Sequence, residues 1–433
     1  MRDLVLLSTA ALAAASAAFA QQPADSLRLR EVTTAAINAD PRQRQIGLQA
    51  SASDLRVRNI LATRLPQISA NGQAQYQSTV TRIAVPIPGI AIPSPSRDTY
   101  DAHVNAQESI FDPTLSSKEA LERAQLAESQ AGVRASVFGR RQEANDAFFA
   151  AATLQQRIGE IGLAITDLES RRQEAVIRFR EGAALPSDTA VVAATLLQRR
   201  QDLYQARADQ AGALERLSDL IGREVPTTTT AVVPNLDAAV TSALGRLGQL
   251  RDRPEYEQFR ATRDRLAKQG QLESAQDKPR MSAFGRVGYG RPGLNMLSSS
   301  FDAYWLGGVQ VQWSPWNWGT TDRDRQALEI QRQIVATNEA SFTESLQRGI
   351  RQAIATIAGL DSSLVLDDEI VALRERIEAE TRVKLNEGVA TAADYADRST
   401  DVLSARLTRI QHRVQRAQAQ ANLLTTLGVE VPQ

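Results

Sequence analysis

The sequence repeats itself at a fixed distance, and this duplication limits the folds available to the chain. Three pairs of identical residues are each 206 positions apart: Gly182 and Gly388, Asp188 and Asp394, and Gly222 and Gly428. Similarity at a constant offset is typical of an architecture built from copies of one unit. We therefore expect two copies of the same set of elements within the 433 residues.

The front half of each copy has its own offset. Pro41 and Pro66 match Pro254 and Pro279, and both pairs are 213 positions apart. The second copy is therefore shorter in its middle, and the Pro-rich run 81–99, opposite the shorter run 291–300, is the expected place of the difference. We place the first repeat at 21–223, a Pro- and Thr-rich linker at 224–235, and the second repeat at 236–433.

Residues 1–20 have the form of a signal peptide. Arg2 precedes an apolar run that ends in Ala18-Phe19-Ala20, a small-x-small cleavage pattern. The alternative, a buried N-terminal helix, fits less well because polar residues follow at once. Export would place the chain in an oxidising compartment, yet it has no cysteine, so neither disulfides nor a lipid-modified cysteine are available.

Charge and composition narrow the possible partners. Fifty basic residues balance fifty acidic residues, which argues against nucleic acid as a partner. Aromatic residues make up only 5% of the chain, and Ala and Gln are abundant. Such a composition favours long helices that pack through small side chains.

Each repeat contains one pair of segments in which apolar and polar residues alternate with a period of two. These segments predict a β-hairpin at about 66–110 and another at about 280–313, each with one apolar and one polar face. Phe284 is an exception, because it falls on the polar side. A soluble, half-buried hairpin alternates in the same way, so the pattern alone does not establish a membrane protein.

Strand length and aromatic residues favour a membrane-spanning sheet. The strands reach the roughly 9–11 residues that a tilted transmembrane strand needs. An aromatic girdle at the lipid interface is expected from Tyr76, Tyr100, Tyr289, Trp305, Trp313, Trp316 and Trp318. Four strands cannot close a barrel, and lipid does not tolerate open sheet edges. A membrane-spanning sheet would therefore need several chains.

Helical patterns fill the rest of each repeat. Short helices precede each hairpin, with Asp40 as an N-cap and Pro41 as the first helical residue in copy one, and Pro254 in the same place in copy two. Long helices are expected at about 115–180 and 321–386, on the order of 100 Å each. Each turns at a glycine and returns, at 189–221 and 391–427.

The order of these features resembles the TolC family of outer-membrane efflux and secretion channels. The supporting motifs are Asp40-Pro41, Leu65-Pro66, the strand exits at 110–113 and 314–319, and the two glycine turns. The resemblance implies a mixed α and β membrane protein, in which a long α-helical coiled-coil barrel adjoins a trimeric β-barrel of four strands per chain. It also implies a bacterial outer-membrane location with a large periplasmic portion, and contact with outer-membrane lipid.

The resemblance further implies partners and a transport role. A homotrimer would act as the passive duct of multidrug efflux or type I secretion, opened by a periplasmic adaptor and an inner-membrane pump of RND, ABC or MFS type. No catalytic, cofactor or metal site is expected. The alternative is a soluble periplasmic coiled-coil scaffold or adaptor that crosses no membrane.

The turn after the second long helix is the expected gate. Asp394 and Asp397 match the aspartates of family channels, and in a trimer they would form two stacked rings of carboxylates that favour cations. Crowding would raise some of their pKa values. The alternative is an ordinary helix N-terminus, where Asp complements the helix dipole.

Gate closure or adaptor docking is expected at the tip turns, through Gly182, Ser187, Asp188 and Gly388. The two glycines would be left-handed C-caps. Family channels close here through an Arg and a Tyr, but the matching positions are Ala390 and Leu385. The candidates to replace them are Arg398, Lys384 and Arg180.

Three other patterns do not indicate a nucleotide or metal site. The run 288–293 matches G-x-G-x-x-G by letter, but no helix follows it. His103 and His412 are far apart, and we expect the acidic run Asp367-Asp368-Glu369 to be a solvated helix face.

Overall fold

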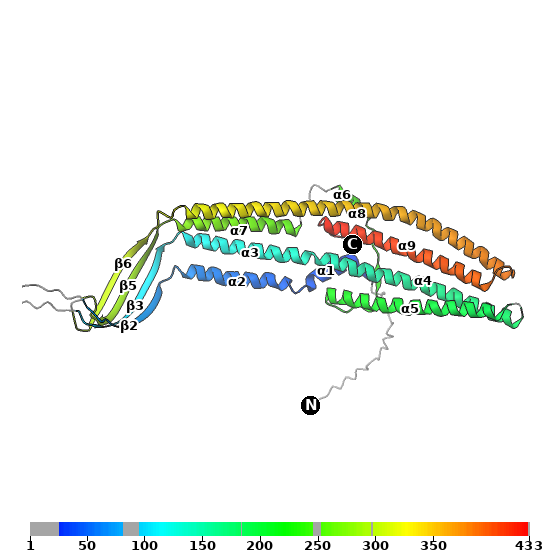
Figure 1. Ribbon diagram of the computed structural model, residues 1–433, viewed down its shortest axis with the longest axis horizontal. Coiled ribbons are helices and arrows are strands. Elements are labelled where there is room, and N and C mark those ends of the chain that lie inside the picture. The colour runs from blue at the N-terminus through cyan, green and yellow to red at the C-terminus, as the bar shows by residue number, and fades with distance from the viewer. Residues whose placement is uncertain (1–25, 81–94, 183, 246–252, 296–297, 432–433) are drawn as a thin grey trace, which may run out of the picture.

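The computed structural model describes residues 26–80, 95–182, 184–245, 253–295 and 298–431. The expected signal peptide and most of the Pro-rich run 81–99 lie outside these ranges. The described part is elongated, with a β-sheet at one end and the tips of two helical hairpins at the other (Figure 1). None of the helices in these ranges has a stretch long and apolar enough to cross a membrane.

Helices make up most of the described chain. They are α1 Leu29–Ala39, α2 Gln43–Ala62, α3 Thr114–Phe138, α4 Arg140–Arg180, α5 Pro186–Ile221, α6 Asp237–Leu244, α7 Pro254–Gln276, α8 Thr320–Asn386 and α9 Ala392–Thr426. The strands are β1 Ser26–Arg28, β2 Gln67–Tyr76, β3 Asp98–Phe111, β4 Thr230–Val232, β5 Arg280–Arg291 and β6 Asp302–Gln312. The hairpins and returning helices lie where the sequence predicts them, within a few residues.

The four long strands form one antiparallel sheet in the order β2-β3-β5-β6. The register pairs Ala74 with Tyr100, Ala102 with Tyr289, and Val287 with Trp305. Directly opposed residues share a face of the sheet. The apolar positions of all four strands therefore lie on one face, as the alternation predicts.

Two aromatic residues on the polar face are explained by glycines on the neighbouring strand. Phe284 is paired with Gly308, and Tyr304 with Gly288. A Cβ atom added at Gly288 would lie 2.5 Å from the Tyr304 ring, and one at Gly308 would lie 3.0 Å from the Phe284 ring. Each ring thus occupies the space above a residue without a side chain, which compensates for the weak packing of glycine in a strand.

The helices form a single layer that continues from the sheet. Next to the sheet, α2, α3, α7 and α8 lie side by side in the same order as the strands; toward the tips the order is α5, α4, α9, α8 (Figure 1). The 67-residue α8 runs the whole length. The layer is fixed by a large apolar cluster near its middle, with Phe148, Phe149, Leu217, Leu423 and Leu424 at its centre.

The first long helix departs from the prediction because it is divided at Gly139 into α3 and α4. The backbone at Gly139 keeps right-handed helical angles, but the N–H of Gln142 bonds three residues back, to the Gly139 carbonyl. Glycine is a poor helix former. Ser345, 206 positions later, stands at the matching point in α8, which is continuous.

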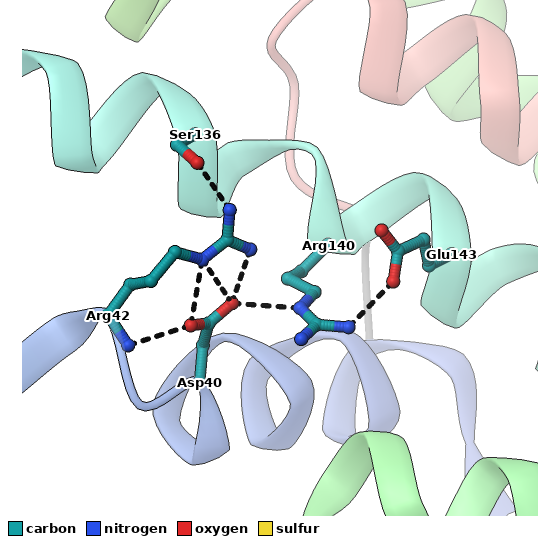
Figure 2. Close-up of polar contacts among 5 residues, drawn as sticks. All are labelled: Asp40, Arg42, Ser136, Arg140 and Glu143. Atoms are coloured by element: carbon teal, nitrogen blue, oxygen red, sulfur yellow. Dashed lines mark hydrogen bonds and ion pairs between the residues drawn. The ribbon is translucent and has the colours of Figure 1, made fainter.

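Asp40 does not cap a helix that starts at Pro41, because α2 begins at Gln43. The buried Asp40 carboxylate accepts hydrogen bonds from the Arg42 N–H at 2.8 Å, the Arg42 guanidinium at 2.6 Å and the Arg140 guanidinium at 2.8 Å. These bonds hold the pKa of Asp40 well below its usual range. The α1–α2 turn is thereby attached to the α3–α4 junction, where Arg42 also contacts Ser136 (Figure 2).

The linker contains structure that the sequence pattern did not predict. The three residues of β4 pair in parallel with β1, aligning Ser26 with Thr230 and Arg28 with Val232. The pairing brings the start of the described chain to the junction between the repeats. Three-residue strands are too short to show a period of two.

Candidate functional site at the helix tips

Each tip turn has a glycine in the left-handed conformation directly after the long helix. Gly182 and Gly388 have φ angles of +75° and +76°, so both are left-handed caps as predicted. After α8, the N–H of Gly388 bonds to the Leu385 carbonyl at 3.2 Å and that of Val389 bonds to the Lys384 carbonyl at 2.8 Å. This pair of bonds is the Schellman motif, which satisfies the last carbonyl groups of a helix.

The two returning helices begin with matching aspartates. Asp188 accepts the Leu185 N–H at 2.9 Å, and Asp394 accepts the Thr391 N–H at 2.9 Å and the Thr391 hydroxyl at 2.7 Å. Hydrogen bonds from Thr391 lower the pKa of Asp394, so in the single chain the shift is opposite to the one expected from crowding. Asp394 is therefore the N3 residue of a capping box whose N-cap is Thr391, which is compatible with a further role as a gate residue.

The predicted gate residues Asp394, Asp397 and Ser187 are open to solvent. Asp394 and Asp397 are both exposed, while Tyr395 and Ala396 between them are buried, so the two carboxylates share the solvent side of α9. Ser187 is exposed at the start of α5. The assignment of these residues to a gate stays a prediction.

Arg178 connects the two helical hairpins at their ends. This α4 residue donates to the Leu385 carbonyl at 2.8 Å, and to the carbonyl and side-chain oxygens of Asn386 at 3.4 and 3.2 Å. It was not among the expected replacements, of which Arg398 pairs instead with Asp401. Sequence reasoning missed Arg178 because its partners include backbone carbonyls, which no motif marks. The available signal in the sequence was that Arg178 matches another basic residue, Lys384, at the offset of 206.

Tyr395 makes a second connection between the hairpins. Its side chain is fully buried, and its hydroxyl donates to Asp167 on α4 at 2.6 Å. The Arg171 guanidinium lies 5.4 Å from the ring centroid, within cation–π range. Burial, with the nearby Asp167 carboxylate, raises the pKa of Tyr395 well above its usual range, so the hydroxyl keeps its proton.

A cavity of about 410 Å³ separates the hairpins between these two connections. Both hairpins contribute to its walls. They include Ala175, Arg178, Leu185 and Val192 from the first hairpin and its turn, and Leu385, Ala390, Ala392 and Tyr395 from the second.

The predicted girdle residues form two groups rather than one. One group lies on the apolar face of the sheet, toward the end that is far from the helices. It consists of Tyr76, Tyr100, Tyr289 and Trp305. Trp313, Trp316 and Trp318 follow β6 next to the helices, and the Trp313 indole donates to the Asp277 carbonyl at 3.1 Å. Their contact with lipid stays a prediction.

The acidic run on α8 is not wholly solvated. Asp367 is buried and lies 2.7 Å from the imidazole of His412 on α9. Asp368 and Glu369 are exposed, as predicted. The described ranges contain no cluster of three or more His, Cys, Asp or Glu residues that could hold a metal ion.

Comparisons with known proteins point in one direction. Residues 249–429 match the family model described as outer membrane efflux protein. Among solved structures, CusC matches with a TM-score of 0.68 at 14% identity, covering 93% of this chain and 92% of CusC. A membrane protein from Pseudomonas aeruginosa gives 0.69 at 17% identity, covering 93% and 90% of the two chains.

The outer membrane protein VceC from Vibrio cholerae gives a TM-score of 0.65 at 14% identity, covering 93% of this chain and 96% of VceC. At such identities the structural matches establish the fold. Comparison with curated proteins gave no match.

Proposed function

The chain belongs to the TolC family of outer-membrane efflux proteins, and from this we propose that it forms the passive trimeric duct of a tripartite efflux pump or type I secretion system. In this proposal the sheet lies in the outer membrane and the helices extend into the periplasm. An adaptor and an inner-membrane transporter of RND, ABC or MFS type would open the tips and supply the energy.

The open edges of the sheet carry the proposal. In the described chain β2 and β6 each have a neighbour on one side only. The apolar face is strongly exposed, with Ile68 at 74% and Trp305 at 77%. Unpaired strand edges in lipid are costly. Pairing β6 of one copy with β2 of the next removes every edge, and three copies give twelve strands.

The helical layer has matching open edges. Toward the tips its outer helices are α5 and α8, and both carry exposed apolar side chains. On α8 they include Leu366, Ile370, Leu373 and Ile377, which have the spacing of a coiled-coil seam. On α5 they include Leu197 and Tyr204. The rotation that pairs β6 with β2 would also place α8 of one copy beside α5 of the next.

The tips would be the gate. Arg178 and Tyr395 hold the two hairpins of a chain together, and three copies of Asp394 and Asp397 would surround the axis just inside the entrance. The lowered pKa of Asp394 keeps its carboxylate charged at neutral pH. The rings would therefore attract cations.

Reconstitution tests the duct. The purified protein should have the mass of a trimer in detergent and give discrete, cation-selective conductance in planar bilayers. Replacing Asp394 and Asp397 together by Ala should lower cation selectivity and weaken block by trivalent cations. A water-soluble protein without conductance would overturn the duct, and a conducting double variant with unchanged selectivity would overturn the aspartate assignment.

A further inference from the structure

We propose that the cavity between the hairpin tips is a binding site for an amphipathic small molecule with a flat apolar body and one anionic group. Its volume of about 410 Å³ lies within the range of about 300–1,000 Å³ that is usual for small-molecule sites. Such sites combine apolar walls with a few converging polar groups. The tip cavity has both.

The apolar body would occupy space left by small side chains. Ala175, Ala390 and Ala392 line the cavity, and the larger walls are Leu185, Val192 and Leu385. Ala184 also lines it and matches Ala390 at the offset of 206. The cavity therefore exists because both turns carry alanine where the hairpins face one another.

The charge of the ligand follows from the ionic groups of the wall. Arg171 pairs with Glu174 at 2.7 Å, and Asp188 accepts a backbone N–H at the start of α5. Arg178 differs, because the hydrogen bonds found for it in the described chain go to neutral oxygens of Leu385 and Asn386. Its guanidinium is the wall cation left to pair with an incoming anion, and a carboxylate or sulfonate matches its geometry.

A ligand in this cavity would contact both hairpins at once. It would therefore bind the closed tips better than separated tips and shift the equilibrium toward closure. This regulatory consequence rests on the proposed duct, whereas the binding site itself does not. The site would make the tips sensitive to anionic amphipathic molecules on the periplasmic side.

The absence of cysteine in the chain allows a direct binding test. Ala390→Cys places a single thiol on the cavity wall, and Ala393→Cys places one on the exposed side of the same turn as a control. The rate of maleimide labelling is measured on the full-length protein in nanodiscs, with naphthalene-1-sulfonate or with the cationic 1-naphthylmethylammonium as probe.

Naphthalene-1-sulfonate should slow labelling of Ala390→Cys about tenfold at about ten times its Kd, because mass action then leaves about one site in eleven empty. The Ala393→Cys rate should not change, and the ammonium probe should protect neither thiol. Adding Arg178→Gln should abolish protection, and Arg178→Lys should retain part of it.

Equal protection by both probes would overturn the anion assignment, and protection by neither would overturn the site. Conductance of the same protein preparations in planar bilayers separates these failures from failure of the duct: a conducting channel without protection rejects the cavity alone, and a protected protein without conductance rejects the duct alone.

Discussion

The hairpins α4/α5 and α8/α9 occupy matching places in the two repeats, but different forces stabilise them. In the first, Ile161 on α4 and Ala206 on α5 belong to a buried apolar cluster with Leu168, Val192 and Leu196. The residues 206 positions after Ile161 and Ala206 are Asp367 and His412, a polar pair in which Asp367 is buried and His412 is half-buried. The same backbone arrangement therefore accepts either an apolar or an ionic seam.

Ion pairs continue along the second hairpin. Arg374 pairs with Asp401, Arg409 with Asp368, and Arg416 with Asp361. One pair is common to both hairpins: Glu169–Arg200 at 2.6 Å and Glu375–Arg406 at 2.7 Å are related by the offset of 206. Because both pairs are partly exposed, they add little to the stability of the hairpins. Their main effect is to fix the register between the two helices.

The junctions between the elements also differ. Asp40, which binds Arg42 and Arg140 in copy one, corresponds to Arg253 in copy two at the offset of 213. Arg253 instead lies over the rings of Phe138 and Phe342, 4.9 and 5.5 Å from their centroids. A buried carboxylate thus holds the divided helix α3–α4, while a cation on aromatic rings lies beside the continuous α8.

Removing the buried carboxylate should have the largest effect. Asp40→Ala removes the buried carboxylate that both Arg42 and Arg140 bind, leaves Arg140 with Glu143 alone, and should cost about 3–5 kcal/mol of unfolding free energy. Thermal unfolding followed by circular dichroism checks this, with Glu143→Ala, an exposed partner of Arg140, as control. An equal small loss in both variants would mean that Asp40 does not anchor the junction.

The same site predicts a pH dependence. The folded pKa of Asp40 is lowered, so its contribution is complete above the unfolded pKa of about 3.9 and is lost as the pH falls from there toward the folded pKa. The Asp40→Asn variant should lose less stability than the wild type below about pH 4. Parallel pH curves for the two proteins would contradict this.

Leu168→Ala should cost about 2–5 kcal/mol, because it opens a cavity in the apolar seam of α4/α5. The matched control is Arg374→Ala, 206 positions later, where an exposed pair should be worth less than about 1 kcal/mol. Equal losses in denaturant unfolding would remove the distinction between the hairpins.

His412→Ala should cost about 1–3 kcal/mol, since it leaves the buried Asp367 carboxylate without its partner. The double variant Asp367→Ile with His412→Ala installs the apolar pair of the first hairpin and should restore the loss. Failure of the double variant to recover stability would show that the two seams are not interchangeable.

The shared ion pair should matter least. Glu169→Gln and Glu375→Gln should each cost less than about 1 kcal/mol, and the cost should shrink further in high salt. A larger, salt-independent loss of unfolding free energy in either variant would indicate that the ion pair stabilises its hairpin as well as fixing the helix register.

The sequence predicted those features that depend on local periodicity. Alternation with a period of two gave both hairpins and their apolar face, and Gly182 and Gly388 marked the turns, because a left-handed cap needs glycine. The features that it did not predict depend on contacts between distant segments. Asp367 looked solvated because its partner His412 is 45 residues away, and the Arg178 connection uses backbone carbonyls that no residue type reveals.

Conductance of a closure-deficient variant tests the central claim, that the two unlike hairpins are held together at the tips to close a duct. Arg178→Gln with Tyr395→Phe removes the hydrogen bonds of both connections, while Arg398→Gln, which breaks only an ion pair within α9, is the control. The double variant should conduct several-fold more than the wild type in planar bilayers, and the control should not. A double variant with wild-type conductance would contradict the account.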